Sequence, residues 1–116
     1  DDAQHPDSKV GGGKHSTGSL YDLKAPESIP ARAAGQVNTA RIVVKGVGVE
    51  HWINGVRVLE ARLDAEAVRA GLEARWGVKH PVYELLTGPA RKKGRIAITH
   101  HGDRAAFRNI RVRELK

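Results

Sequence analysis

The chain has 116 residues, 40% of them hydrophobic, which is enough for one domain with a modest core and argues against disorder. It contains no cysteine, which excludes disulfides and thiolate metal sites, and no apolar run is long enough to span a membrane. Lys and Arg outnumber Asp and Glu by 20 to 13, but two Trp, two Tyr and one Phe offer little for base stacking, so nucleic acid is not a favoured partner.

Residues 1–37 are expected to be mostly loop. They are rich in Gly, Ser, His and Pro and include the triplet Gly11-Gly12-Gly13, a composition that favours irregular backbone. Within this stretch, residues 17–23 could form a short strand. A loop of this length in a compact domain is typically functional or disordered.

The pattern changes to strands from residue 38 onward. Residues 40–45 are rich in β-branched side chains and alternate, with Ile42 and Val44 on one face. Residues 49–53 and 56–60 are two more such runs, and Asn-Gly separates them. Because a type I′ turn needs positive φ at both central positions, Asn-Gly is a strong hairpin signal. The sequence therefore predicts a three-stranded meander.

Residues 64–76 are instead typical of a short helix. They contain four alanines, and Val68 and Leu72 lie one helical turn apart on the same face. Asp64 could cap the start of this helix, and Gly77 could end it.

Two further strands are predicted near the C-terminus, over residues 94–101 and 106–113, because both runs alternate. Their inward-facing apolar residues would be Ile96, Ile98, Ile110 and Val112. The sum is mainly antiparallel β with one helix, which predicts a β-sandwich formed by a single domain over residues 1–116.

Four segments, taken in order, carry a resemblance to a known family. They are Asn-Thr-Ala-Arg-Ile-Val-Val-Lys-Gly at 38–46, Val-Glu-His-Trp-Ile-Asn-Gly at 49–55, Lys-Gly-Arg-Ile-Ala-Ile-Thr-His-His-Gly at 93–102 and Phe-Arg-Asn-Ile-Arg-Val-Arg-Glu-Leu at 107–115. They resemble the C-terminal half of the 3-keto-disaccharide hydrolase domain, a concanavalin A-like jelly roll. Residues 1–7 and 18–23 are similar to the middle of that domain. Strands usually precede this middle stretch in the family, so the resemblance implies a jelly roll that is incomplete at its N-terminus.

An incomplete sandwich leaves apolar side chains without partners, because two sheets are needed to bury each other's inner faces. We expect Ile42, Val44 and the four inward residues of the C-terminal strands to lack cover, beside open sheet edges. Another chain, a longer parent protein or a homo-oligomer could supply the missing strands. We favour a partner chain or a fragment over a self-sufficient monomer.

The resemblance implies a carbohydrate-active protein, a hydrolase or lyase of 3-keto-glycosides, in a periplasmic or extracellular location. A ketone at C3 acidifies the hydrogen at C2, so a base can remove that proton and the glycosidic bond can break by elimination followed by hydration. The reaction needs a base, an acid for the leaving oxygen and an electrophile that stabilises the enolate. A divalent metal ion could be that electrophile, although the sequence itself requires no cofactor.

Two other functions stay open from the sequence. One is a non-catalytic carbohydrate-binding or structural module, since one sandwich architecture serves many roles. The other is a self-assembling subunit completed by strands from another chain.

The candidate catalytic residues are His101 and Asp2. His101 ends a predicted strand on the face opposite Ile96 and Ile98, where an imidazole could act as a base near neutral pH. A structural hydrogen bond of a loop histidine is an equally good interpretation. Asp2 and Asp1 begin a stretch that also holds imidazoles, which could bind a divalent ion or do acid–base work. The spacing matches no metal motif, so a polar loop is the favoured interpretation and no metal ligand is assigned.

The candidate substrate-binding residues are Asp1, Tyr21, Lys45, Trp52 and Arg108. Trp52 or Tyr21 could offer a ring face to a sugar, although a core Trp is the favoured interpretation of Trp52. Lys45 and Arg108 could hydrogen-bond hydroxyls or stabilise an enolate. A solvated strand residue is the favoured alternative for Lys45, and an interior pairing for Arg108, which alternation directs inward.

Overall fold

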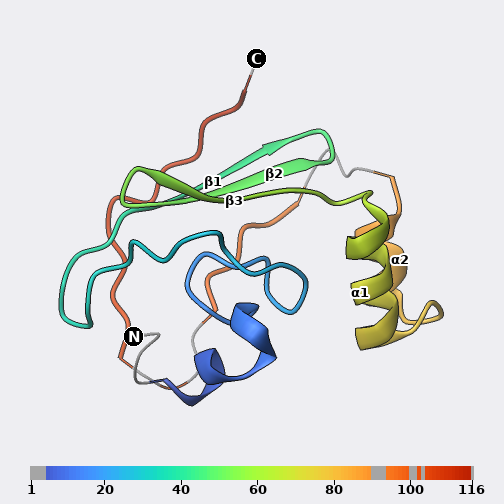
Figure 1. Ribbon diagram of the computed structural model, residues 1–116. Helices are drawn as coiled ribbons and strands as arrows, with labels where there is room; N and C mark the ends of the chain where they lie inside the picture. Colours follow the sequence, from blue (N-terminus) through green and yellow to red (C-terminus); the bar gives the residue numbers. More distant parts are fainter. Residues whose placement is uncertain (1–4, 90–93, 100–101, 103, 116) are drawn as a thin grey trace.

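The computed structural model describes residues 5–89, 94–99, 102 and 104–115. Within these residues the elements are two 3₁₀ helices, η1 (Pro6–Lys9) and η2 (Gly11–Gly13), three strands, β1 (Ala40–Lys45), β2 (Gly48–Ile53) and β3 (Val56–Arg62), and two α-helices, α1 (Glu66–Trp76) and α2 (Pro81–Thr87). The strands form one antiparallel sheet in the order β1-β2-β3. The N-terminal loop lies along one face of this sheet, and α1 and α2 lie side by side at one end (Figure 1).

The predicted three-stranded meander is confirmed, and β1 coincides with the predicted run. Asn54 and Gly55 have φ angles of 50° and 83°, the positive values that the hairpin turn requires. The Asn54 side chain also ties the turn to the loop before β1. Its Nδ2 donates to the Pro30 carbonyl oxygen, and its Oδ1 accepts from the Thr39 N–H, both at 2.9 Å.

The core of the described residues is small. Ile53, Val58 and Leu59 of the sheet form one buried cluster, with Leu20 and Ala31 of the N-terminal loop packed against it. The other buried hydrophobic residues are Val49 on β2 and Val68 and Leu72 on α1. Val58 and Leu59 are neighbours in sequence, and strict alternation would place only one of them inward. A β-bulge resolves the conflict, because His51 pairs with Leu59 and Trp52 pairs with Arg57, leaving Val58 as the extra residue.

The N-terminal loop covers β2 and β3 where a second sheet was expected. The Glu27 N–H donates to the Val58 carbonyl oxygen at 2.7 Å, and Leu20 and Ala31 pack against the buried cluster. Gly18 lies so close to β3 that a Cβ added there would be 2.7 Å from Cγ2 of Val58. A glycine at this position therefore lets the loop backbone lie directly on the sheet.

The complete sandwich is not present in the described residues, which contain one small sheet and two helices. Residues 94–99 and 104–115 cover most of the two predicted C-terminal strands, yet they run as irregular chain (Figure 1). The expected short strand over 17–23 is likewise reduced to a single bridge between Leu20 and Lys24. A strand is held by hydrogen bonds to a neighbouring strand, so an alternating sequence alone does not make one.

The apolar residues that were expected to lack cover are exposed, as predicted. They are Ile42, Val44, Ile96, Ile98, Ile110 and Val112. Ile42 and Val44 share one face of β1, because they pair with His51 and Val49 of β2. The N-terminal loop therefore covers β2 and β3 on this face and leaves the side chains of β1 open.

The helix predicted over residues 64–76 is confirmed as α1, but its start differs from the expectation. The N-cap is Ala65, which makes no side-chain capping bond. Asp64 instead accepts two hydrogen bonds from Arg62, at 3.0 Å and 2.7 Å, and this guanidinium lowers the pKa of the Asp64 carboxyl. The Asp64 carboxylate is thus engaged in a bidentate ion pair with Arg62 and does not cap the helix. Gly77 ends α1 with φ at 77°, as predicted.

The second helix, α2, was not predicted, although its start carries a recognisable signal. Pro81 occupies the first helical turn, and the His80 side chain accepts a hydrogen bond from the Val82 N–H at 3.1 Å. In the part of the chain that the structure describes, no helix has the length and apolar character needed to cross a membrane.

Candidate functional site

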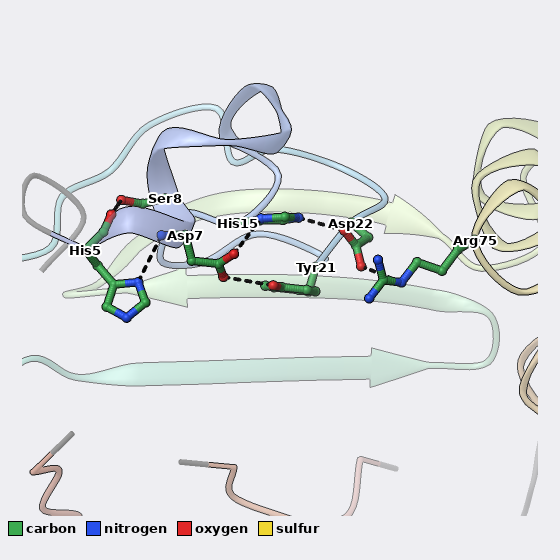
Figure 2. A network of polar contacts seen from close by, with 7 residues as sticks. All are labelled: His5, Asp7, Ser8, His15, Tyr21, Asp22 and Arg75. Atoms are coloured by element: carbon green, nitrogen blue, oxygen red, sulfur yellow. Dashed lines mark hydrogen bonds and ion pairs between the residues drawn. The ribbon is translucent and has the colours of Figure 1, made fainter. Parts of the chain in front are cut away.

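A cluster of polar side chains surrounds His15, between the N-terminal loop and α1 (Figure 2). The Nδ1 atom of His15 is 3.0 Å from Oδ1 of Asp7, and its Nε2 atom is 2.6 Å from Oδ1 of Asp22. The imidazole is largely buried, with 14% of its side chain exposed. Both ring nitrogens are therefore held by carboxylates in a site that excludes most water.

Each of these carboxylates also holds a second group. The Tyr21 hydroxyl donates to Oδ2 of Asp7 at 2.8 Å, and Nε of Arg75 on α1 is 2.9 Å from Oδ2 of Asp22. The Tyr21 ring also stacks on His15, with centroids 4.4 Å apart and planes 10° from parallel (Figure 2). We call these five residues the His15 cluster. Its contacts run from Tyr21 through Asp7, His15 and Asp22 to Arg75.

Local backbone structure sets the positions of the two carboxylates. Asp7 lies in η1, which begins at Pro6, and its N–H donates to Nδ1 of His5 at 3.2 Å. Asp22 has a φ of 64°, a left-handed conformation that Asp tolerates better than most residues. Its N–H donates to the Lys14 carbonyl oxygen at 3.2 Å. The loop therefore turns back on itself and places both carboxylates against one imidazole.

Two glycines allow the close approaches around the cluster. A Cβ on Gly11 would lie 3.0 Å from Nε2 of His15 and 3.1 Å and 3.2 Å from the two ring carbons beside it, so the backbone of η2 packs against a face of the imidazole. A Cβ on Gly71 would lie 2.9 Å from Cδ2 of Leu23, so α1 approaches the loop directly beside Asp22. This approach brings Arg75, one helical turn further on, to the Asp22 carboxylate.

The arrangement favours the charged form of His15. A neutral imidazole carries one N–H and can donate to only one carboxylate, whereas the imidazolium donates to both. The hydrogen bond to Asp22, reinforced by the charge of Asp7, raises the pKa of His15 above 6.5. The Tyr21 hydrogen bond and the charge of His15 lower the pKa of Asp7, and the bond to Asp7 raises the pKa of Tyr21.

These contacts determine what the His15 cluster can do. Both ring nitrogens of His15 are bound to carboxylates, so neither is free to act as a general base. Tyr21 stays a neutral phenol, and 48% of this residue is exposed. The cluster thus presents an aromatic ring whose orientation is fixed by a stack on one face and by a hydrogen bond at its hydroxyl.

Comparison with known proteins identifies the family. Residues 2–113 match the family described as the 3-keto-alpha-glucoside-1,2-lyase-like domain. The chain belongs to this family. It is also 34% identical over 124 residues to a 3-keto-disaccharide hydrolase of Bacteroides thetaiotaomicron, an alignment that covers 99% of this chain and 42% of that relative. The resemblance carried by the four sequence segments is confirmed.

Of the residues that the sequence predicts for catalysis or substrate binding, Tyr21 is in the His15 cluster. His101, Asp1 and Asp2 lie outside the described residues, and their predicted roles stay predictions. Lys45 is exposed at the end of β1, as expected for a solvated strand residue. Its role in substrate binding is likewise still a prediction.

Trp52 does not belong to the buried core, and the interpretation as a core Trp is wrong. It is half-buried, and it alternates with Val49 and Ile53 of β2, whose side chains fill the core on the other face. The Arg41 guanidinium lies over its ring, 4.1 Å from the centroid, and its Nε1–H donates to Glu50 at 2.7 Å. A cation therefore occupies one face of the ring, and a sugar would have to use the other.

Arg108 is exposed, so the predicted interior pairing is wrong for this residue. The physical reason is that residues 104–115 do not form a strand, and alternation defines an inward side only where a sheet exists. Its role in substrate binding stays a prediction.

The described residues form no group of three or more His, Asp or Glu side chains arranged to hold a metal ion. Asp7 and Asp22 are both committed to His15 and to a second partner. The His15 cluster is thus an internally neutralised network, and its donors do not fit the divalent ion that the chemistry could use.

Sequence reasoning gave His15 no weight and missed Asp22 and Arg75. The available signal was the spacing, because acidic residues lie eight positions before His15 and seven after it, in a loop that contains three consecutive glycines. Such a loop can close on itself and bring these groups together.

Proposed function

We propose that the chain acts in carbohydrate chemistry, as a hydrolase or lyase of 3-keto-glycosides. Membership of the family supports the carbohydrate class, and the Bacteroides relative is named a 3-keto-disaccharide hydrolase. The observation that carries the proposal is the Tyr21 ring, held in place by its stack on His15 and its hydrogen bond to Asp7. The periplasmic or extracellular location implied by the resemblance stays a prediction.

A ring held in this way suits sugar recognition. The apolar C–H face of a pyranose stacks on an aromatic face, and Tyr21 has one face free of His15. Because the ring is already ordered, binding loses little side-chain entropy. Asp7, whose side chain is 37% exposed, lies at the edge of this ring and can accept a hydrogen bond from a sugar hydroxyl.

The proposed division of roles follows from the contacts that occupy both nitrogens of His15. The His15 cluster binds and orients the sugar, but it does not supply the base that removes the C2 proton. His101 and Asp2 are the residues that we propose for base and acid, and both await a test.

Replacing Tyr21 with alanine is expected to weaken binding of a 3-keto-glucoside about tenfold, because the stacking surface is lost. Tyr21→Phe keeps the ring but loses the bond to Asp7, so it should lie between the wild type and Tyr21→Ala. Isothermal titration calorimetry measures the affinity, and release of the free sugar measures turnover. Tyr83→Ala, on α2, is the matched control and should leave affinity unchanged.

An unchanged affinity in a Tyr21→Ala variant with a native circular dichroism spectrum would rule out Tyr21 as a stacking surface for the sugar. Turnover by the wild-type chain supports the hydrolase or lyase. Binding without turnover would instead support the non-catalytic carbohydrate-binding module.

A second candidate function is self-assembly, and the exposed face of β1 favours it. Ile42 and Val44 are 66% and 56% exposed beside the buried Val49 of β2. We propose a second copy of the chain as the occupant. The same chain carries residues 104–115, whose alternating apolar side chains are exposed outside any strand, and strand addition to β1 would satisfy both surfaces.

Self-assembly predicts that the chain forms dimers or larger species as its concentration rises. Size-exclusion chromatography with light scattering measures this, and Ile42→Lys should restore the monomer because it places a charge in the apolar contact. Lys45→Glu changes a charge at the end of the same strand and serves as a control. A monomer at every concentration would exclude this function.

A further inference from the structure

We propose that His15 is the positioning residue of Tyr21: its charged ring holds Asp7 and Tyr21 in place, and loss of its proton releases them while Asp22 and Arg75 stay joined. The inference goes beyond the proposed function, because the switch operates in the free protein without a sugar. It stands on the unequal contacts at the two nitrogens of one imidazole.

The two sides of His15 are not equivalent. The contact from Nε2 to Asp22 is 2.6 Å, and the contact from Nδ1 to Asp7 is 3.0 Å. Asp22 is held independently by Arg75 and by the hydrogen bond of its own N–H to Lys14. A neutral imidazole keeps one N–H, and the shorter contact to the better-anchored carboxylate retains it.

The attraction between His15 and Asp7 is then lost. The lone pair of Nδ1 would face the negatively charged Oδ1 of Asp7, which turns a charge-assisted hydrogen bond into a repulsive contact. Asp7 accepts the hydrogen bond of the Tyr21 hydroxyl, so a displaced Asp7 no longer holds that hydroxyl. The Tyr21 ring also stacks on the imidazole of His15, and this stack loses the attraction of the positive charge. A single deprotonation therefore weakens both contacts that fix the ring.

The charged and titratable groups around His15 come from each neighbouring element in the described part of the chain. Asp7 comes from η1, Tyr21 and Asp22 come from the loop that follows, and Arg75 comes from α1. His5 also acts on Asp7, because its charge lowers the pKa of that carboxyl. η2 contributes only the backbone at Gly11.

The direction of the pKa shifts sets the pH at which the ring is released. The pKa of His15 is raised above 6.5, so its stabilising contribution is complete below 6.5 and is lost as the pH rises through the raised value. The pKa of Asp7 is lowered from 3.8, so its contribution is present above 3.8 and is lost as the pH falls through the lowered value. Release of Tyr21 with Asp22 and Arg75 still joined is therefore expected only on the alkaline side.

A pH titration of the full chain by nuclear magnetic resonance tests the switch without any ligand. The ring signals of Tyr21 are expected to titrate with the imidazole signals of His15, at one shared midpoint above 6.5. The Nε–H signal of Arg75 should keep its hydrogen-bonded shift over the same range. His80→Asn is the matched control, because it removes another imidazole while asparagine can still cap α2, and the midpoint should not move.

Two variants separate positioning from a merely structural role. His15→Gln should abolish the pH dependence of the Tyr21 signals. Asp7→Asn should lower the midpoint of His15 toward 6.5, because one of the two carboxylates that raise its pKa is gone. Asp7→Asn keeps the shape of the side chain, so it provides the test if His15→Gln does not fold.

Three results would overturn the switch. The first is a Tyr21 signal that ignores the titration of His15, the second is an Arg75 signal that moves in step with it, and the third is an unchanged midpoint in Asp7→Asn. None of them depends on sugar binding, so the switch and the proposed function fail independently.

Discussion

Replacing Leu59 with alanine is expected to lower the free energy of unfolding by about 3 kcal/mol. Leu59 is fully buried and belongs to one cluster with Ile53 and Val58. Truncation removes the transfer free energy of this buried side chain and leaves a cavity within the cluster. Urea denaturation followed by circular dichroism measures the loss. A domain of this size has a total stability of about 5–15 kcal/mol, so the variant should unfold at a much lower urea concentration.

The matched control is Ile42→Ala, in the same row of the sheet. Ile42 pairs with His51, which in turn pairs with Leu59, so the three side chains share one face. Ile42 is 66% exposed, and its truncation should change the stability by less than about 0.5 kcal/mol. A loss at Ile42 as large as that at Leu59 would contradict the uncovered face of β1.

The sequence predicts elements well where neighbouring residues decide the structure. The hairpin at Asn54 and Gly55 and the end of α1 at Gly77 follow from backbone conformations that few other residues adopt. The described residues of the two predicted C-terminal strands, 94–99 and 106–113, do not form strands, because pairing depends on a partner strand that local pattern does not specify. The prediction that Asp64 caps α1 is wrong, because Arg62 binds the Asp64 carboxylate instead.

The candidate site is predictable only in part, for a related reason. Tyr21 could be proposed as an aromatic residue in a functional loop, but the partners that fix its ring come from η1, the loop and α1. No periodicity links Asp7, His15 and Arg75, because folding of the loop brings them together. Trp52 and Val49 lie on opposite faces of β2, as alternation along a strand requires, yet only the position of the core shows which face is buried.

Gly18→Ala is expected to destabilise the chain by about 3 kcal/mol, the second large effect. The φ of Gly18 is 91°, which strains any residue with a Cβ by about 1–2 kcal/mol. The new Cβ would also lie 2.7 Å from Cγ2 of Val58, a fully buried side chain, and such overpacking costs about 1–3 kcal/mol. Thermal unfolding and urea denaturation both measure this loss.

Gly12→Ala separates the two contributions. Gly12 also has a positive φ, 59°, but nothing lies within 4 Å of an added Cβ, so its replacement should cost only the backbone strain of about 1 kcal/mol. Equal losses at Gly12 and Gly18 would contradict the contact between the loop and β3. Because the Gly18 carbonyl oxygen is also 2.9 Å from Nδ1 of His51, moving the loop off the sheet would disturb the segment that carries His15 and Tyr21. Gly18→Ala should therefore alter the pH titration of the Tyr21 ring, whereas Gly12→Ala should preserve it.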